Sequence, residues 1–427
     1  MEIHKRSFYG WYVVCAGFIV SILGTGILSN TLGTFIKPVS DVLSLERAQY
    51  SLTMSIAALT STIALPFWGK FIEIYSLRKL MLIHGILVTI AILSLSLSTS
   101  LWQFYLLSVL IGYAGGSVSS LVVSTLISRW FADKRGLALG LASSGSGLGP
   151  MLLIPATTTI ITRFGWVFAY RFIAGVFLIL LIIAIIFIRN RPQDSGLEPY
   201  RVKIHQSAGK VQLAGSKKIT WTGMTQKEAV RSKCFKYFIV IFLLLGIIYG
   251  GTINHLYAYL TDLGYSNSFA SLVISLQMAF ILLGKATLGM ALDKFGIKFG
   301  ITAALIAFIM AFVCLNNAQI QGIAVIYPMF GGFGIATIVV GSAYITGHYF
   351  GVTGYGKILS LFMSAQSFGA TIGTYFSGFI FDKTGSYQSA WIIYAIIAFI
   401  ALASYLKGDA LFMKNDIKAE PVILTDV

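Results

Sequence analysis

The sequence predicts an all-α membrane protein with twelve transmembrane helices in two pseudo-symmetric six-helix bundles. Hydrophobic residues make up 57% of the 427-residue chain and charged residues only 11%, and the mean hydropathy is +0.83. This composition leaves too little polar surface to cover a water-soluble protein of this size. The net charge of +16 is carried by residues between apolar runs, which indicates membrane topology and argues against nucleic-acid binding.

Apolar runs long enough to span a membrane recur along the whole chain. A helix of about 20 apolar residues crosses a hydrocarbon core of about 30 Å. The first six predicted spans are residues 11–35, 47–72, 79–98, 102–128, 137–161 and 167–188. The other six are residues 235–261, 268–292, 298–317, 320–346, 357–380 and 387–406. We therefore expect an N-terminal bundle over residues 1–188 and a C-terminal bundle over residues 235–406.

Basic residues gather in alternate loops and in the segment between the two bundles. The stretch from Arg189 to Lys236 has eleven Lys or Arg and three Asp or Glu. Because Lys and Arg in short loops stay on the cytoplasmic side, we expect residues 189–234 to be a basic cytoplasmic linker and residues 407–427 a cytoplasmic tail. The start of the chain lacks a short apolar region with a cleavage site. The sequence thus predicts a multi-pass protein of the cell (inner) membrane with both termini cytoplasmic.

An internal repeat relates the two predicted bundles. Helix 2 ends in Gly69-Lys-Phe-Ile-Glu73 followed by Arg78, and helix 8 ends in Gly289-Met-Ala-Leu-Asp293 followed by Lys294. A second echo relates residues 130–149 to residues 349–373, where an aromatic pair precedes a helix rich in Gly, Ser and Ala. Repeats of this kind build many secondary transporters, whose solute site lies where the halves meet near the midplane.

These segments resemble those of a known transporter superfamily. The turn at residues 289–298 resembles the loop signature of the major facilitator superfamily, and residues 69–79 are a looser copy of it. Within that superfamily, residues 129–149 resemble the helix 4 to 5 segment of the monocarboxylate transporter and oxalate:formate antiporter families. Residues 9–14 resemble the segment that leads into helix 1 of these two families, and a prokaryotic branch of them is the better match. The resemblance implies the fold of that superfamily.

The glycine-acid turns are candidates for a cytoplasmic gate. A carboxylate at Asp293 can accept hydrogen bonds from the first amides of a neighbouring helix while Lys294 lies at the headgroups. The alternative is that Asp293 only caps a turn. The expected gating set is Gly69, Glu73, Arg78, Gly289, Asp293, Lys294, Lys134 and Arg135.

Lys285 is the main candidate for substrate binding. It lies eight residues before Asp293, so it is about 12 Å inside the end of helix 8. An ammonium there costs about 2.5 to 3.5 kcal/mol on insertion scales, and the predicted interior has no Asp or Glu to pair with it. We expect an organic anion to be the partner. The alternatives are a lysine that snorkels to the interface or one that burial keeps neutral.

The resemblance refines this expectation. The two families usually have Arg in helix 8, whose planar group binds a carboxylate with two parallel hydrogen bonds. Lysine is a point charge with looser selectivity, and residues 357–381 provide no second embedded cation. One buried cation favours a monoanion over a dianion.

Other polar residues in the spans are weaker candidates for the substrate site. His255 can touch the substrate or carry a proton, or it can simply bond to a backbone carbonyl. Asn254 lies next to it in a Gly-containing stretch that suggests unwinding, and Gln277 is expected to face nearly the same way as Lys285. Tyr113 and Asn30 are expected to line the cavity.

The sequence has no constellation of catalytic residues, no nucleotide motif and no metal-ligand spacing, so we expect no enzyme activity and no cofactor. The function that it favours is secondary active transport of small organic anions, monocarboxylates of the lactate, pyruvate or formate type, by proton symport or anion exchange with alternating access. The partners would be the anion, protons in the symport case and the lipid bilayer, with the protein as a monomer. The alternatives are an exporter of drugs or sugars and a transporter-like solute sensor.

Overall fold

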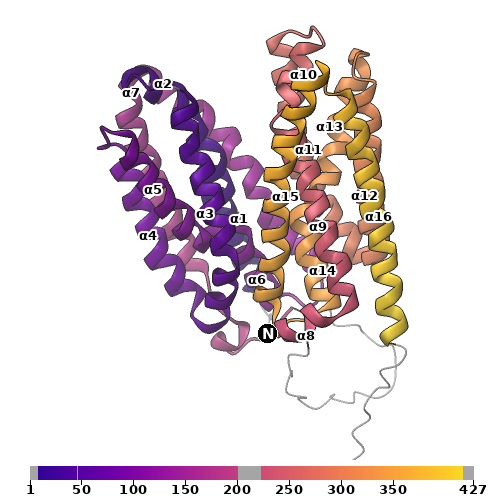
Figure 1. Cartoon of the computed structure of the whole chain (residues 1–427). Coiled ribbons are helices and arrows are strands. Elements are labelled where there is room, and N and C mark those ends of the chain that lie inside the picture. The colour runs from indigo at the N-terminus through magenta and orange to yellow at the C-terminus, as the bar shows by residue number, and fades with distance from the viewer. Residues whose placement is uncertain (1–7, 46, 201–222, 417–427) are drawn as a thin grey trace, which may run out of the picture.

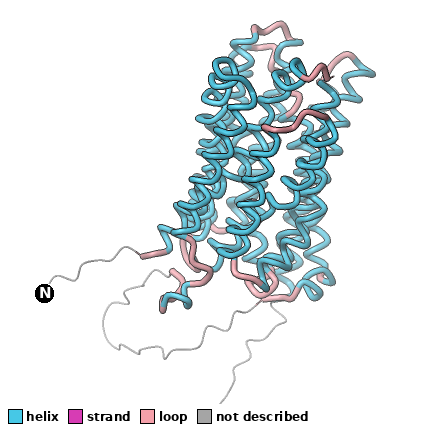
Figure 2. Tube along the Cα trace, turned by 90° about the vertical axis from the view of Figure 1, so that its left-hand side faces the viewer, coloured by secondary structure: helices cyan, strands magenta, loops and turns pink. Residues whose placement is uncertain are grey.

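The computed structural model describes residues 8–45, 47–200 and 223–416. These residues are almost entirely helical, and their only β contacts are two isolated bridges. The helices run roughly along one axis and most loops gather at the two ends (Figure 2). The expected N-terminal tail up to residue 7, linker residues 201–222 and tail residues 417–427 lie outside the described part of the chain.

Six crossings form the N-terminal half. The first consists of α1 (Gly10–Ser21), η1 (Ile22–Asn30), η2 (Thr31–Phe35) and α2 (Ile36–Val42). The next two are α3 (Arg47–Ile74) and α4 (Leu77–Leu95), and the fourth joins α5 (Leu101–Ala114), η3 (Gly115–Val118) and α6 (Ser120–Trp130). Helix α7 (Arg135–Phe187) has 53 residues, too long for one crossing. It therefore supplies both the fifth and the sixth.

Gly165 divides α7 into its two arms. Its φ of 81° and ψ of 167° are not helical, and L side chains rarely adopt that backbone conformation. No neighbouring atom lies within 4 Å of the place a Cβ would take, so the backbone angle alone requires glycine here. The bend matches the boundary expected between residues 161 and 167.

Six further crossings form the C-terminal half. They are α9 (Lys233–Ile253) with α10 (Leu256–Asp262), α11 (Asn267–Phe295), α12 (Ile297–Asn316), α13 (Gln321–Ala336) with η5 (Thr337–Gly341) and α14 (Ser342–Tyr349), α15 (Tyr355–Thr384) and α16 (Gln388–Asp416). Between the halves lie η4 (Pro192–Ser195) and α8 (Gln226–Arg231). Helix α16 continues past residue 406, where the expected span ended. In this last part of the helix Asp409 is buried and accepts a hydrogen bond from Tyr349.

Within the described residues, ten helical stretches are long and apolar enough to cross a membrane. That set treats α7 as one stretch and omits α15, whose Ser, Thr, Gly and Gln residues lower its hydropathy. Counting both arms of α7 and including α15 gives twelve crossings in the described chain. The twelve-helix prediction is confirmed.

Around the acidic turns the two halves are related by an offset of 220 in the sequence. Positions 69 and 289, 73 and 293, and 136 and 356 each differ by 220 and make matching contacts. A Cβ at Gly136 would lie 2.3 Å from the Gly289 carbonyl oxygen, and one at Gly356 would lie 3.3 Å from the Gly69 carbonyl oxygen. This offset lets each contact in one half be compared with its counterpart.

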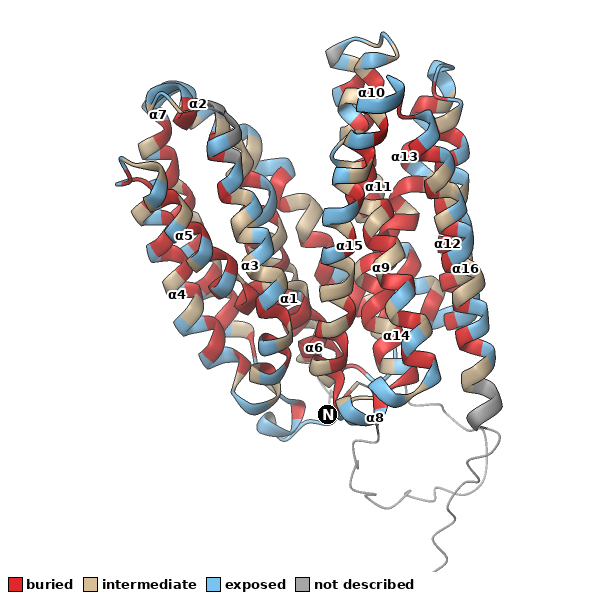
Figure 3. Ribbon diagram, viewed as in Figure 1, coloured by how far each residue is buried: buried red, intermediate tan, exposed pale blue. Residues whose placement is uncertain are grey.

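The halves meet most closely at the end that carries α8, called here the linker end, and they diverge toward the other end (Figure 1). At the linker end α7 crosses α11 and α3 crosses α15. A Cβ at Gly289 would lie 2.1 Å from the Gly136 carbonyl oxygen, and one at Gly69 would lie 2.8 Å from that of Gly356. Small residues thus permit both crossings. Helix α6, near this junction, is almost wholly buried (Figure 3).

The described ends of the linker attach to equivalent loops of the two halves. Tyr200 forms a parallel bridge with Phe131, and Gly223 forms an antiparallel bridge with Gly351. Positions 131 and 351 again differ by 220. Each end of the linker therefore docks at the same place in its own half.

Candidate functional site

Lys285 reaches from α11 in the C-terminal half to α7 in the N-terminal half. Its side chain is buried, with the residue 5% exposed. The ammonium donates to the Ser146 Oγ at 2.5 Å and to the Ser143 carbonyl oxygen at 3.3 Å. Helix α7 comes this close because Gly140 packs against the Lys285 backbone, where a Cβ would lie 2.3 Å from the Lys285 carbonyl oxygen.

Both acceptors of the ammonium are neutral oxygens. The ion pairs among the described residues join Lys298 to Asp409 and Lys357 to Glu73, and neither includes Lys285. A buried charge without a counter-charge is costly. The arrangement leaves one ammonium proton for a further acceptor.

Asp293 joins α11 to the first turn of α7. Its Oδ1 accepts from the Gly136 amide at 2.9 Å and its Oδ2 from the Leu137 amide at 2.8 Å. A carboxylate at a helix N-terminus also interacts favourably with the helix dipole. This is the contact with a neighbouring helix that the sequence analysis described, whereas its role in gating stays a prediction.

Glu73 makes the equivalent contact at the crossing of α3 and α15. Its Oε1 accepts from the Lys357 amide at 3.3 Å, and its Oε2 lies 2.6 Å from the Lys357 Nζ. Positions 137 and 357 differ by 220, so both acidic residues bind equivalent amides. Only the Glu73 contact adds a lysine.

Arg135, the first residue of α7, also lies at the linker end. Its guanidinium lies over the ring of Tyr355 at 5.1 Å and donates to the Ser128 Oγ at 2.5 Å. It also lies against Gly347, which leaves no room for a side chain at that position. Arg135 therefore contacts both halves.

The remaining residues of the expected gating set lie further out. Lys134 directly precedes α7 in a left-handed conformation, and its ammonium is 5.9 Å from the centre of the Tyr200 ring. Lys294 is exposed beside Phe295, and the exposed Arg78 uses its backbone amide to bind Asn190. Within the described chain these three side chains form no hydrogen bond or ion pair with the opposite half.

His255 and Asn254 lie at the break between α9 and α10 and bind α15. The His255 Nε2 is 2.9 Å from the Thr374 carbonyl oxygen, which only accepts, so Nε2 carries a proton. Its Nδ1 is 3.2 Å from the Tyr387 hydroxyl, and the exposed Asn254 donates to the Thr374 Oγ1 at 2.9 Å. The helix is interrupted at these residues, as expected. Of the two roles considered for His255, the structure shows the bond to a backbone carbonyl.

Gln277 does not face the same way as Lys285, so that expectation is wrong. Its side chain is fully buried within the C-terminal half and donates to the Tyr327 hydroxyl on α13 at 2.8 Å. Eight residues turn an α-helix by about 80° beyond two full turns. The two side chains therefore face different neighbours.

Among the described residues, the ring contacts and hydrogen bonds of Tyr113 and Asn30 lie within their own half. The Tyr113 ring lies 6.0 Å from the rings of Trp68 and His84. Asn30 is exposed and donates to the Thr25 carbonyl oxygen at 2.6 Å. Substrate binding by His255, Asn254, Gln277, Tyr113 and Asn30 stays a prediction.

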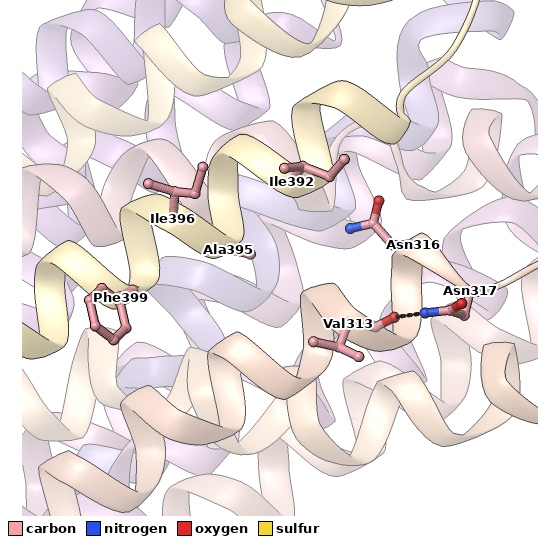
Figure 4. A pocket seen from close by; sticks show the side chains of 7 residues that line it. All are labelled: Val313, Asn316, Asn317, Ile392, Ala395, Ile396 and Phe399. Atoms are coloured by element: carbon pink, nitrogen blue, oxygen red, sulfur yellow. Dashed lines mark hydrogen bonds between the residues drawn. The ribbon is translucent and has the colours of Figure 1, made fainter.

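Two cavities differ in character. The larger, about 460 Å³, is an apolar groove between α12 and α16, where Asn317 bonds to the Val313 carbonyl oxygen (Figure 4). It has no charged lining residue and lies within one half. The smaller, about 30 Å³, lies between the halves and is lined by residues of α6, η5, α14 and α15. Among the described residues no cluster of His, Cys, Asp and Glu could hold a metal.

The residues that bind the Lys285 ammonium and the Glu73 carboxylate were not among the expected site residues. By sequence, Ser143 and Ser146 are ordinary small residues of a membrane helix, and Lys357 is the first residue of a predicted span. The offset of 220 could have identified Lys357, because it makes Glu73 the counterpart of Asp293 and Lys357 the counterpart of Leu137.

The fold and this site define a solute transporter built from two related halves, with a cationic position between them. A family model described as Major Facilitator Superfamily matches residues 14–267 and 253–423. The chain belongs to that superfamily and is a multi-pass membrane transporter.

Several relatives align over almost the whole chain. The uncharacterized MFS-type transporter YcxA of Bacillus subtilis is 25% identical and covers 93% of this chain and 94% of its own. Monocarboxylate transporter 13 of Bos taurus is 23% identical (90% and 86%), and the oxalate:formate antiporter of Oxalobacter formigenes is 24% identical (92% and 90%). The crystal structure of the transporter FucP in the outward conformation superposes with a TM-score of 0.71 at 12% identity, covering 93% of this chain and 97% of that one. The predicted superfamily and fold are confirmed.

Proposed function

We propose that this protein is a secondary active transporter of small organic anions, most of all monocarboxylates of the lactate, pyruvate or formate type. The observation that carries the proposal is the buried Lys285 ammonium, which bridges the halves through neutral oxygens alone. A monoanion placed beside it would supply the missing counter-charge. The similarity to monocarboxylate transporters and to an oxalate:formate antiporter supports the same substrate class.

The position of the Lys285 ammonium between the two halves links anion binding to transport. An anion that binds Lys285 replaces an uncompensated charge by a neutral pair, so the two halves can rearrange around it at lower cost. The anion competes with Ser146 and Ser143 for the ammonium, which weakens one link between α7 and α11. Binding is thereby coupled to movement between the halves.

The linker end acts as the cytoplasmic gate in this proposal. The contacts of Asp293 with Gly136 and Leu137 and of Glu73 with Lys357 hold it closed, and they break when the protein opens inward. The orientation rests on the excess of Lys and Arg in the linker. Both termini are then cytoplasmic, and the protein works as a monomer in the cell membrane.

The coupling is proton symport or anion exchange. In symport the proton travels on His255, on Lys285 or on the substrate itself, because the described spans place no carboxylate beside Lys285. In anion exchange, a second anion binds Lys285 and is carried in the opposite direction, which returns the site to the side from which it started.

The test is counterflow in liposomes that contain the purified protein. Radiolabelled lactate, pyruvate, formate and oxalate are offered at two pH values, against the same unlabelled anion inside. We expect counterflow of the monocarboxylates and weaker counterflow of oxalate. An imposed proton gradient that drives uptake without internal anion indicates symport. The absence of counterflow for all four anions would contradict the proposal and favour a sensor or a different cargo.

A further inference from the structure

The corner between α8 and α9 carries a cluster of basic side chains. Lys227 and Arg231 lie on α8, and Lys233 and Lys236 lie on the first turn of α9. All four residues are exposed, and within the described chain none of them takes part in an ion pair. The acidic residue between them, Glu228, uses its carboxylate to cap the start of α8. The corner is therefore a positively charged patch with no acidic partner among the described residues.

The exposed face of α8 combines this charge with an apolar side chain. Lys227, Val230 and Arg231 have the spacing i, i+3 and i+4, so they share one face of the helix. Val230 is 40% exposed, whereas Ala229 on the opposite face is fully buried. Cations around an apolar side chain are typical of segments at a bilayer surface, where the apolar group faces the acyl chains and the cations lie among the headgroups.

The sequence places this corner at the edge of the bilayer. After Lys236 the chain has no Asp, Glu, Lys or Arg until Asp262, and the stretch between them contains most of the apolar span of α9. Lys236 therefore marks the end of the hydrocarbon region. Helix α8 lies at the linker end of the molecule, just outside that region (Figure 1). Clusters of Lys and Arg directly outside a transmembrane helix attract anionic phospholipids.

Backbone contacts join the same corner to the beginning of α15. The Met224 amide donates to the Phe350 carbonyl oxygen at 2.8 Å. A Cβ at Gly354, the residue before α15, would lie 2.8 Å from the Met224 carbonyl oxygen. The first turn of α15 carries Lys357, which pairs with Glu73 of the other half. A ligand that holds α8 in place thus also steadies the α15 side of the closed linker end.

The name α8 patch is used here for the surface formed by Lys227, Val230, Arg231, Lys233 and Lys236. We propose that the α8 patch binds the headgroup of an anionic phospholipid from the leaflet at the linker end. The negative headgroup lies beside the four cations, and the acyl chains begin beside Val230. The bound lipid holds α8 against the start of α15 and favours the closed linker end. This inference concerns membrane lipid and does not depend on which solute the protein transports.

Binding is tested with dihexanoylphosphatidylglycerol, a short-chain anionic lipid, on the purified full-length protein in an uncharged detergent. Native mass spectrometry counts the lipids bound at each concentration. The Lys227→Gln/Arg231→Gln variant loses two of the four cations, so we expect its affinity to be about tenfold lower. The matched control is Lys79→Gln/Arg189→Gln, which removes one exposed Lys and one exposed Arg from the linker end of the N-terminal half. We expect the control to bind as the native protein does.

The outcomes separate a lipid site from general attraction of charge. No loss of affinity in Lys227→Gln/Arg231→Gln, or an equal loss in Lys79→Gln/Arg189→Gln, would overturn the α8 patch. Glycerol 3-phosphate has the phosphate without acyl chains, so equally tight binding of it would indicate a plain anion site and overturn the lipid assignment. Equal binding of dihexanoylphosphatidylcholine would overturn the requirement for net negative charge. Size-exclusion chromatography of each variant ensures that only folded protein is compared.

The effect on the linker end is tested in phosphatidylcholine liposomes with and without phosphatidylglycerol. A Ser360→Cys substitution, with the native cysteines replaced by serine, places a thiol where Ser360 is fully buried against Gly69. We expect phosphatidylglycerol to slow the reaction of this thiol with an uncharged, membrane-permeant reagent about twofold, since the lipid shifts the population toward the closed state. In the Lys227→Gln/Arg231→Gln background the rate should not depend on phosphatidylglycerol. The same lipid dependence in both backgrounds, or none in either, would overturn the effect on the linker end.

Discussion

Glu73 binds Lys357 through both its carboxylate oxygens, with Oε2 2.6 Å from the Nζ and Oε1 3.3 Å from the backbone amide. Asp293, its counterpart, binds two backbone amides and no lysine. The two crossings at the linker end are thus built on one plan but are closed by different forces. The crossing of α3 and α15 has an ion pair that salt can screen, and that of α7 and α11 depends on a helix N-terminus.

The Glu73→Gln variant should open the linker end more often. It keeps an oxygen for the Lys357 amide and loses the ion pair, which is worth about 0.5 kcal/mol at a partly exposed site. A cysteine placed by Ser360→Cys, at a fully buried position against Gly69, reports the opening when the three native cysteines are replaced by serine. We expect its rate of reaction with a thiol reagent to rise about twofold at low salt and less at high salt.

The Lys357→Met variant provides the control for that prediction. Combined with Glu73→Gln, it should add little, because both changes remove the same ion pair. If the two effects instead add in full, the residues act independently and the ion pair does not hold the crossing.

The Lys285→Gln variant should lose anion uptake and remain folded. Glutamine still bonds to Ser146 and lacks the charge that pairs with a carboxylate, so initial uptake of lactate should fall at least tenfold. The exposed Lys407 gives a matched control, since Lys407→Gln removes the same charge outside the proposed site. Uptake by Lys285→Gln near the native rate, or an equal loss in Lys407→Gln, would refute the assigned role of Lys285.

Much of the fold was predictable because hydropathy and loop charge are local properties. The boundary near Gly165 and the repeated turns at Gly69 and Gly289 follow from short segments of sequence. The end of α16 was missed because Asp409 reads as a polar residue outside the membrane. Its partners Tyr349 and Lys298 come from other helices, and only packing brings them together.

The candidate site was predictable in part. A lone lysine in an apolar helix is conspicuous, so Lys285 could be chosen from sequence. Its contacts with Ser143 and Ser146 depend on how α7 crosses α11, which the sequence does not state. Gln277 was misjudged because a helix turns by 100° per residue, and a spacing of eight residues is not a whole number of turns.

The Gly223→Val variant should weaken the attachment of the linker to the C-terminal half. A Cβ at this position would lie 2.8 Å from the Phe350 carbonyl oxygen and 2.8 Å from the Val352 amide. The bridge to Gly351 and the bond from the Met224 amide to the Phe350 carbonyl at 2.8 Å would be disturbed. We expect a loss of about 1 kcal/mol, measured as a lower temperature of half-unfolding of the purified protein. No change would indicate that this bridge contributes nothing to stability.

The Gly289→Ala variant tests whether close backbone contact closes the linker end. The added Cβ would lie 2.1 Å from the Gly136 carbonyl oxygen, and because that oxygen belongs to a helix backbone, α7 and α11 would have to move apart. Overpacking of this kind costs about 1 to 3 kcal/mol, so the temperature of half-unfolding should fall and the Ser360→Cys reporter should react faster. Gly175→Ala is the control, since no atom lies within 4 Å of its added Cβ and alanine is the better helix former. If both variants lose stability equally, the cost comes from replacing a helical glycine in general and not from the crossing of α7 and α11.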